Sequence, residues 1–329
     1  MREMWAARLV APSTFAHVSV PAPLAAALAP GEVLLRVRAG AICGSDMPLF
    51  KGAIQRQGGL GNHPDGAPPG VGCPMHEVVG EVLASRHPGF EPGATAVGWA
   101  LGQDAIAELV VTEGDSLVPD DGRLPPAEAI VAQPLACVIY AVERMGDVSG
   151  QRVAVLGQGP IGVLFSHVLK TLGRAAHVIG VDRVDRSAEA SAFGVDEFVH
   201  ASCDRWAESL GPADRPQVVV ESIGHQVGTL ACAIDAAAGG GLVYYFGVPD
   251  DLVYPVPMHA FFRKDLTLRA GTTKDRPRVL RLAQQYLRDH PAILDAYVTN
   301  RLPMTRVQEA YDLAAAPRAG QLKVVVEAA

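Results

Sequence analysis

The pattern of apolar and polar residues changes partway along the chain. Up to about residue 132, short segments alternate polar and apolar positions, as half-buried strands do, and the clearest are 32–39, 78–84 and 94–99. From about residue 127, short apolar runs alternate with longer segments whose apolar residues recur at helical spacing. The sequence therefore predicts a β-rich domain followed by an α/β domain with a doubly wound parallel sheet.

The α/β part of the chain predicts a regular series of elements. Helices are expected over 127–145 (broken at Pro134), 160–172, 185–193 and 226–238, and strands over 153–156, 177–181, 197–200, 217–221 and 241–247. Further on, 278–289 has an amphipathic helical pattern, and 321–327 is a strand that we expect to return to the first domain. On this basis the β-rich domain comprises 1–132 and 274–329, and the α/β domain comprises 133–273.

A glycine-rich turn follows the first strand of the α/β part. The apolar run 153–156 leads into the spacing G-x-G-x-x-G, formed by Gly157, Gly159 and Gly162. In this motif the glycines allow a sharp turn, the close approach of a pyrophosphate and tight packing of the next helix. The free N–H groups at the start of that helix then hold the phosphates. The motif therefore predicts a dinucleotide-binding site.

An acidic residue supports this interpretation. Asp182 ends the next predicted strand, 20 residues after Gly162, where a carboxylate binds the ribose hydroxyls of NAD. Because a carboxylate repels the 2′-phosphate of NADP, Asp182 favours NAD. Arg183 and Arg186 lie nearby in the sequence and would weaken that preference.

Composition and charge narrow the class of protein. The chain of 329 residues has a formal net charge of −7 and no large basic cluster, which excludes nucleic acid and an anionic membrane as main partners. Its first residues lack the apolar core of a secretion signal, and no apolar run approaches the length of a membrane span, so we expect a cytoplasmic protein. The five scattered cysteines favour reduced thiols and a metal ligand over a disulfide framework.

Two short segments of the β-rich part carry residues suited to metal chemistry. Cys43, Ser45 and Asp46 lie within four residues, and His76 and Glu77 open a predicted strand. Thiolate, imidazole and carboxylate are all zinc ligands, and three protein ligands with an open position are typical of a catalytic zinc site. Such an ion would polarise an alcohol oxygen, lower its pKa and favour the departure of hydride.

These motifs, in this order, resemble those of the medium-chain dehydrogenase/reductase superfamily, in its branch of zinc-dependent alcohol and polyol (sorbitol, threonine, glucose) dehydrogenases. The resemblance rests on the segments 40–46, 76–82, 90–93 and 157–162, and it extends through 221–225 and 239–249 over nearly the whole chain. It implies a GroES-like catalytic domain and a Rossmann domain, with the cofactor in the cleft between them. It also implies a homodimer or homotetramer that associates through the edge of the Rossmann sheet, near 265–269.

The resemblance gives roles to individual residues. Cys43 and His76 match the catalytic zinc ligands of the family, and Glu77 matches a glutamate that ligates zinc in polyol-type members. Ser45 matches the hydroxyl that binds the substrate oxygen and passes its proton on, and Asp46 matches the carboxylate that orients the ligand histidine. The cofactor-binding residues implied by the motifs are Gly157, Gly159, Pro160, Ile161, Gly162, Asp182, Arg183, Gly247 and Val248.

Four features depart from the family pattern. Gln133 replaces a glutamate that ligates the metal in several members, so either Glu77 or Gln133 acting through water completes the zinc shell. Pro48 stands where many members carry a proton-relaying histidine, and Met75 replaces a glycine and is expected to narrow the pocket. The segment 93–117 contains no cysteine, so the structural zinc lobe of the family is absent and one zinc ion is expected.

Together these features predict a zinc-dependent oxidoreductase that transfers hydride between a secondary alcohol and NAD(P), giving a ketone. One catalytic zinc ion and NAD are the expected cofactors, with NADP less favoured. The resemblance and a polar loop with Asn62, His63 and Asp65 indicate a small hydroxylated substrate such as a polyol, sugar or cyclitol. Two alternatives stay open, a zinc-free NAD(P)H-dependent reductase of activated double bonds and a non-catalytic cofactor-binding protein.

Overall fold

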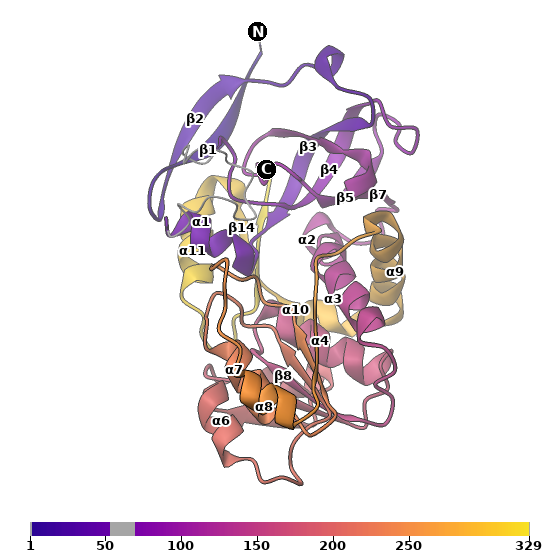
Figure 1. Cartoon of the computed structure of the whole chain (residues 1–329). Coiled ribbons are helices and arrows are strands. Elements are labelled where there is room, and N and C mark those ends of the chain that lie inside the picture. Colours follow the sequence, from indigo (N-terminus) through magenta and orange to yellow (C-terminus); the bar gives the residue numbers. More distant parts are fainter. Residues whose placement is uncertain (1, 53–69, 329) are drawn as a thin grey trace. The chain divides into compact units, whose positions relative to one another are not determined.

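The computed structural model describes residues 2–52 and 70–328, and the chain forms two compact units (Figure 1). The first unit comprises Met1–Ala136, Asp275–Ala316 and Gln321–Ala329. The second unit comprises Cys137–Lys274 and Pro317–Gly320. The limits of the two domains given above stay a prediction.

The first unit is built mainly from antiparallel strands. They are β1 (Glu3–Ala11), β2 (Thr14–Pro21), β3 (Glu32–Ala41), β4 (Glu77–Ser85), β5 (Thr95–Trp99), β6 (Leu109–Glu113), β7 (Leu117–Asp120), β14 (Val298–Pro303) and β15 (Lys323–Glu327). Its helices are α1 (Met47–Phe50), α2 (Pro126–Ala129), α9 (Arg276–Asp289), α10 (Ala292–Tyr297) and α11 (Val307–Ala315), with the 3₁₀ turns η1 (Ala25–Ala27), η2 (Gly44–Asp46), η4 (Gly114–Ser116) and η6 (Met304–Arg306).

The main sheet of this unit brings together segments that lie far apart in the sequence. β1 and β2 form a separate hairpin, while the main sheet has the order β14-β15-β3-β4-β5-β7, with β6 also paired to β3. β3 runs antiparallel to β4, and Ala41 faces Glu77 across the pair. On its other side β3 pairs with β15, so the segment 321–327 does return to the first unit, as predicted. The end of β3 and the starts of β4 and β15 therefore meet at one end of the sheet.

The second unit contains an all-parallel sheet with helices packed on it. Its strands are β8 (Arg152–Leu156), β9 (His177–Asp182), β10 (Glu197–His200), β11 (Val218–Glu221), β12 (Leu242–Tyr245) and β13 (Thr267–Ala270). Its helices are α4 (Pro160–Thr171), α5 (Ser187–Ala190), α6 (Cys203–Ser209), α7 (Thr229–Ala236) and α8 (Met258–Arg263), with the 3₁₀ turn η5 (Ser191–Phe193), and α3 (Ala132–Met145) leads into it from the first unit.

The strand order of this sheet is β10-β9-β8-β11-β12-β13. It is the order of the doubly wound dinucleotide-binding fold, in which the winding reverses between the first and fourth strands, here β8 and β11. Alternate aliphatic side chains of the central strands are buried against α7 and neighbouring helices. The predicted class, a β-rich GroES-like domain with a Rossmann-like parallel sheet, is confirmed.

One predicted boundary is wrong. The helical segment 127–145 is interrupted at Ile130 and Val131, between α2 and α3, whereas Pro134 lies in the first turn of α3. Backbone N–H groups in a first turn have no partner within the helix, so a residue that lacks this group is tolerated there.

One apolar stretch in the described part of the chain, Pro126–Met145, has the length and composition of a membrane span. In the most apolar part of this stretch, 72% of the residues are buried within the protein, which is the usual state of a core helix.

Candidate functional site

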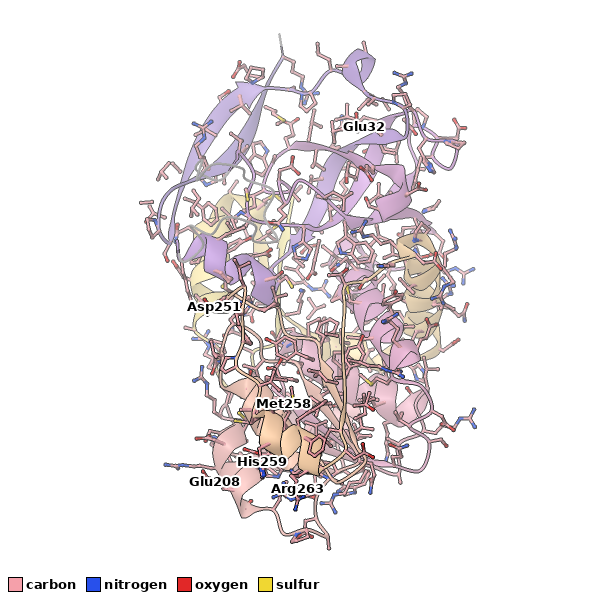
Figure 2. The ribbon with its side chains drawn as sticks, viewed as in Figure 1. Glu32, Glu208, Asp251, Met258, His259 and Arg263 are labelled. Carbon is pink, nitrogen blue, oxygen red and sulfur yellow. The ribbon has the colours of Figure 1, made fainter. Side chains whose placement is uncertain are left out.

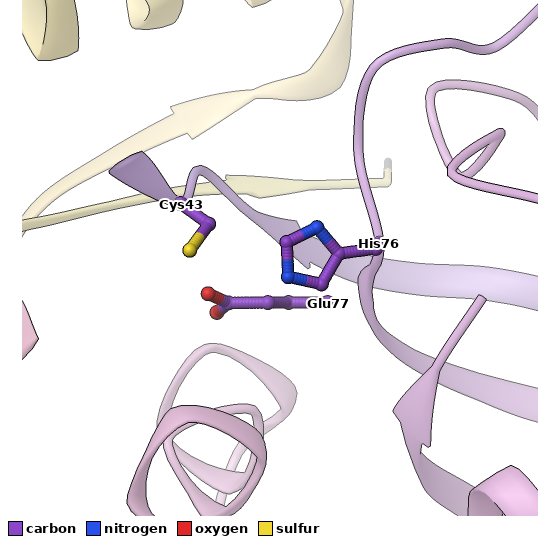
Figure 3. Close-up of side chains that lie close together, drawn as sticks. All are labelled: Cys43, His76 and Glu77. Atoms are coloured by element: carbon purple, nitrogen blue, oxygen red, sulfur yellow. The ribbon is translucent and has the colours of Figure 1, made fainter. Parts of the chain in front are cut away.

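Cys43, His76 and Glu77 form a cluster of three side chains with metal-binding atoms. Cys43 follows the end of β3, and His76 and Glu77 stand at the start of β4, so the antiparallel pairing of these strands brings the segments together. The sulfur, imidazole nitrogen and carboxylate oxygen all lie within 4.8 Å of one another. Figure 3 shows the three side chains turned toward a common point. The structure thus brings together the three residues that the sequence predicts as metal ligands.

Asp46 connects two members of this cluster. One of its carboxylate oxygens accepts the N–H of Cys43 at 2.8 Å, and the other lies 3.0 Å from Nδ1 of His76. The Asp46 side chain is only 1% exposed, so these contacts are shielded from water. Burial lowers the pKa of His76, but the Asp46 charge and hydrogen bond outweigh it and raise that pKa well above its ordinary value. With Nδ1 donating to Asp46, Nε2 is the nitrogen left to bind a metal.

Glu77 is fully buried and paired with a cation that the sequence analysis did not identify. Lys323, from β15, places its Nζ 2.5 Å from Oε1 of Glu77 and donates also to the Ile42 carbonyl at 2.9 Å. Burial raises the pKa of the Glu77 carboxyl, and Lys323 opposes that shift. The second oxygen, Oε2, is buried and has no hydrogen-bond partner among the described residues. An unsatisfied buried carboxylate oxygen of this kind is expected where a cation binds.

The glycine turn of the second unit lies at the carboxyl end of the parallel sheet. It follows β8 directly, beside the point where the strand order reverses, which is where ligands bind in such sheets. A side-chain carbon at Gly162 would collide with the carbonyl oxygen of Gly157. The third glycine of the motif is therefore required so that α4 can begin at Pro160 and present its first N–H groups to the same edge.

Asp182, at the end of β9, is held beside this turn by backbone contacts. Its two carboxylate oxygens accept the N–H groups of Gln158 at 2.6 Å and Val184 at 2.8 Å. Arg186 is buried and donates to the carbonyl of Arg318 at 2.8 Å, while Arg183 is exposed. Of the two nearby arginines, one is therefore engaged in packing rather than free to reach a ligand.

Comparison with known proteins agrees with the fold of both units. The alcohol dehydrogenase GroES-like domain family matches residues 29–122. L-idonate 5-dehydrogenase of Escherichia coli is 25% identical, covering 84% of this chain and 86% of its own length, and sorbitol dehydrogenase of Macaca fascicularis is 26% identical, covering 86% and 85%. The structure of an alcohol dehydrogenase from Thermus sp. ATN1 superposes with a TM-score of 0.82 at 24% identity, covering 99% of this chain and 100% of that one. These similarities support the medium-chain dehydrogenase/reductase superfamily as the family of this chain.

Within this superfamily the matched relatives indicate the polyol dehydrogenase branch.

The other residues assigned from the family pattern occupy varied positions. Ser45 is half-buried in η2, beside Cys43 and Asp46 in the chain. Gln133 is buried in the first turn of α3, and its contact with a metal through water stays a prediction. Asn62, His63 and Asp65 lie outside the described residues.

The expectation that Met75 narrows the substrate pocket is wrong. Its side chain is fully buried in the core of the first unit, with its sulfur packed against the bare backbone of Gly40. A longer side chain is accommodated there because the facing position carries no Cβ. Cys73 is also buried, which raises the pKa of its thiol to about 12 and makes it a poor thiolate ligand.

Two residues that support the Cys43, His76 and Glu77 cluster were missed by sequence reasoning. The first is Lys323, which the sequence marks only as a lysine at the start of a strand that continues with apolar residues. The second is Tyr311 of α11, whose hydroxyl donates to the Pro74 carbonyl, two residues before His76. Its ring packs on Phe15 and Phe50, each at 5.0 Å between ring centroids, and burial raises the pKa of its hydroxyl. No local motif marks Tyr311, because its partners come from distant segments.

Proposed function

We propose that this protein is a zinc-dependent dehydrogenase that oxidises a secondary alcohol to a ketone with NAD(P), acting on a polyol, sugar or cyclitol. The observation that carries the proposal is the convergence of Cys43, His76 and Glu77, with the buried Oε2 of Glu77 left unsatisfied among the described residues. Such a group is stable when a cation completes its coordination.

The donor set fits zinc. Ligand atoms at zinc distances of 2.0 to 2.3 Å lie roughly 3 to 4 Å apart in a tetrahedral site, and the three atoms here fall within 4.8 Å of one another. One sulfur, one nitrogen and one carboxylate oxygen leave a fourth position for a substrate oxygen. Gln133 is a neutral amide and a weaker ligand, so its proposed part is a contact through water.

The residues of the chain divide the chemistry between them. Bound zinc supplies Lewis acidity that lowers the pKa of an alcohol, and NAD supplies the hydride acceptor. Cys43, His76 and Glu77 would hold the ion, and Asp46 fixes the orientation of two of them. Lys323 favours the ionised form of the Glu77 carboxylate and fixes its orientation. Ser45 receives the alcohol proton, and since Pro48 cannot relay it, the proton leaves through water or the cofactor ribose.

The cofactor proposed is NAD, with NADP as the weaker alternative. Asp182 presents a carboxylate beside the glycine turn, and Arg186 is engaged with Arg318. Comparing kcat/KM for the two cofactors tests this. We expect a preference for NAD that shrinks in Asp182→Ser, and an equal or greater efficiency with NADP in the unaltered protein would contradict it.

The substrate class is drawn from the relatives, whose names specify idonate and sorbitol as substrates of those proteins. The decisive experiment is an NAD-reduction screen over simple alcohols, polyols, sugars and cyclitols, with and without a chelator, alongside metal analysis. We expect about one zinc per chain, turnover of a hydroxylated compound, and loss of turnover on chelation that added zinc restores. Activity that persists without metal, or the absence of any alcohol turnover, would overturn the proposal.

The proposed assembly is a homodimer or homotetramer in the cytoplasm. β13 is the last strand of the parallel sheet, and all four of its residues are exposed. The helix α8, which precedes β13 in the chain, also exposes Met258 and Phe262, and Met258 is labelled in Figure 2. Light scattering at several concentrations tests this assembly, and Leu268→Lys in β13 should weaken it.

A further inference from the structure

Two loops follow neighbouring strands of the parallel sheet, and they lie at the carboxyl end of the sheet, as the glycine turn does. The first, 222–228, connects β11 to α7, and the second, 246–257, connects β12 to α8. β11 lies between β8 and β12 in the parallel sheet, so both loops emerge on the side where the turn after β8 lies. The placement puts them at the border of the proposed dinucleotide site.

The first loop is fastened to the glycine turn at its start. The hydroxyl of Ser222 donates to the carbonyl oxygens of Leu156 at 2.8 Å and Gly157 at 3.0 Å. Glu221, which is fully buried, accepts the N–H groups of Ile223 at 3.1 Å and Gly224 at 3.0 Å. A change in the path of this loop would therefore displace the glycine turn that is proposed to hold the pyrophosphate.

The two loops touch backbone to backbone at Gly247. A side-chain carbon at this position would collide with the backbone of Gly224 and with the carboxylate of Glu221. The second loop therefore lies directly against the first, with no side chain between them. Direct hydrogen bonds also join the two loops.

His225 and Asp250 supply such a bond. The Nδ1 atom of His225 lies 2.7 Å from Oδ1 of Asp250, and the His225 N–H donates to the Val248 carbonyl at 3.0 Å. Asp250 is itself anchored, because its N–H donates to the Tyr254 hydroxyl at 3.0 Å. Both side chains are about three-quarters buried, with 23% and 24% of their surfaces exposed, so water competes weakly for the bond.

The backbone of His225 is in the left-handed region, with φ of +54°. Residues other than glycine adopt this conformation only when their surroundings hold them in it, and such residues cluster at ligand-binding loops. Without its partners in the second loop, His225 would relax toward ordinary backbone angles and carry loop 222–228 with it.

We propose that His225 and Asp250 are positioning residues that hold these two loops in the arrangement that accepts the dinucleotide, and thereby set the affinity for NAD. The inference rests on the proposed function, since it names a determinant of the same cofactor site. When only a fraction of molecules has the competent arrangement, the apparent Kd rises in proportion to the inverse of that fraction. The pair should therefore affect cofactor binding and leave the metal chemistry unchanged.

The test compares Asp250→Ala with Asp251→Ala, a matched loss of one charge from the neighbouring position of the same loop, labelled in Figure 2. For Asp250→Ala we expect the Kd for NADH, measured by fluorescence, and the KM for NAD to rise about five- to tenfold. The kcat at saturating NAD, the KM for the alcohol and the zinc content should stay within about twofold, as should every parameter of Asp251→Ala. Asp250→Asn retains an acceptor oxygen and should recover most of the affinity.

A double variant distinguishes positioning from independent effects. If the two side chains act through one bond, His225→Ala with Asp250→Ala should bind NADH no more weakly than the weaker single variant. Unchanged NADH affinity in Asp250→Ala, or an equal loss in Asp251→Ala, would overturn the inference. NADH binding is measured without turnover, so a protein that binds NADH but oxidises no alcohol refutes the proposed function alone. Should Asp250→Ala fail to fold, His225→Gly, which tolerates the same backbone angles and has no side chain to donate to Asp250, gives the comparison.

Discussion

The two candidate sites of this protein are built in contrasting ways. The metal cluster consists of side chains from the segment after β3 and from the start of β4, supported by residues of η2, β15 and α11. The dinucleotide site consists mainly of backbone, and its glycine turn, the start of α4 and Asp182 all lie within 26 consecutive residues. A site made of local backbone can be recognised from one motif. A site made of distant side chains becomes visible only when the fold brings its parts together.

The largest expected effect comes from breaking the metal cluster alone. Cys43→Ser removes the thiolate ligand, and zinc content and alcohol oxidation should fall together, with kcat/KM reduced by about 10³-fold because Lewis-acid activation supplies several kcal/mol. NADH affinity should be unchanged. Cys203→Ser, at a half-buried thiol of the second unit, serves as the control. Retained zinc and activity in Cys43→Ser would show that the cluster is not the catalytic centre.

Removing the counter-charge of Glu77 tests whether the cluster depends on a distant strand. Lys323→Met leaves a buried carboxylate unpaired, and the free energy of unfolding of the zinc-free protein should fall by about 3 to 5 kcal/mol in urea titrations. In the double variant with Glu77→Gln, both partners are neutral and most of that stability should return. A single variant as stable as the unaltered protein would mean that Glu77 is accommodated without Lys323.

The dinucleotide site, which consists mainly of backbone, can be disrupted without changing the metal cluster. Gly162→Ala places a methyl group against the Gly157 carbonyl, so the turn must shift, and the Kd for NADH should rise by about 10- to 100-fold. Zinc content should remain at the level of the unaltered protein. Gly122→Ala provides a control for loss of a surface glycine, since a Cβ there meets no neighbouring atom, although its φ of +69° adds backbone strain. Tight NADH binding in Gly162→Ala would show that the glycine motif is not part of the cofactor site.

The smallest expected effect concerns Asp104, whose backbone bridges to Met75 in the segment before His76. Burial raises the pKa of its carboxyl from 3.8 to about 6. The folded protein therefore holds this proton more tightly than the unfolded chain does, and the contribution of Asp104 to stability falls as the pH rises from about 4 to about 6 and is flat above.

Asp104→Asn should abolish this dependence and add about 1 to 2 kcal/mol above pH 6, because no charge is then desolvated. Urea titrations across that pH range measure both quantities. A stability difference between Asp104→Asn and the unaltered protein that does not grow through this interval would contradict the assigned direction.

The sequence was informative wherever the physical cause of a feature is local. Turn glycines, strand alternation and the spacing to Asp182 predicted the parallel sheet and its glycine turn, and the pairing of Cys43 with His76 and Glu77 followed from a family pattern. Pro134 was misinterpreted because its effect depends on its position within a helix that the pattern does not delimit. Lys323 and Tyr311 were missed because each acts on residues more than 200 positions away.

The separation of Glu77 and Lys323 by 246 positions has a consequence for biosynthesis. The ribosome completes the whole second unit before it makes β15, so the nascent chain carries Glu77 without its counter-charge during most of its translation. The side of β3 that does not face β4 likewise lacks its partner at residues 39–41 until β15 is made. Final assembly of the cluster is therefore expected to be a late event, and newly made chains would bind the proposed zinc ion in its mature coordination only after β15 has joined the sheet.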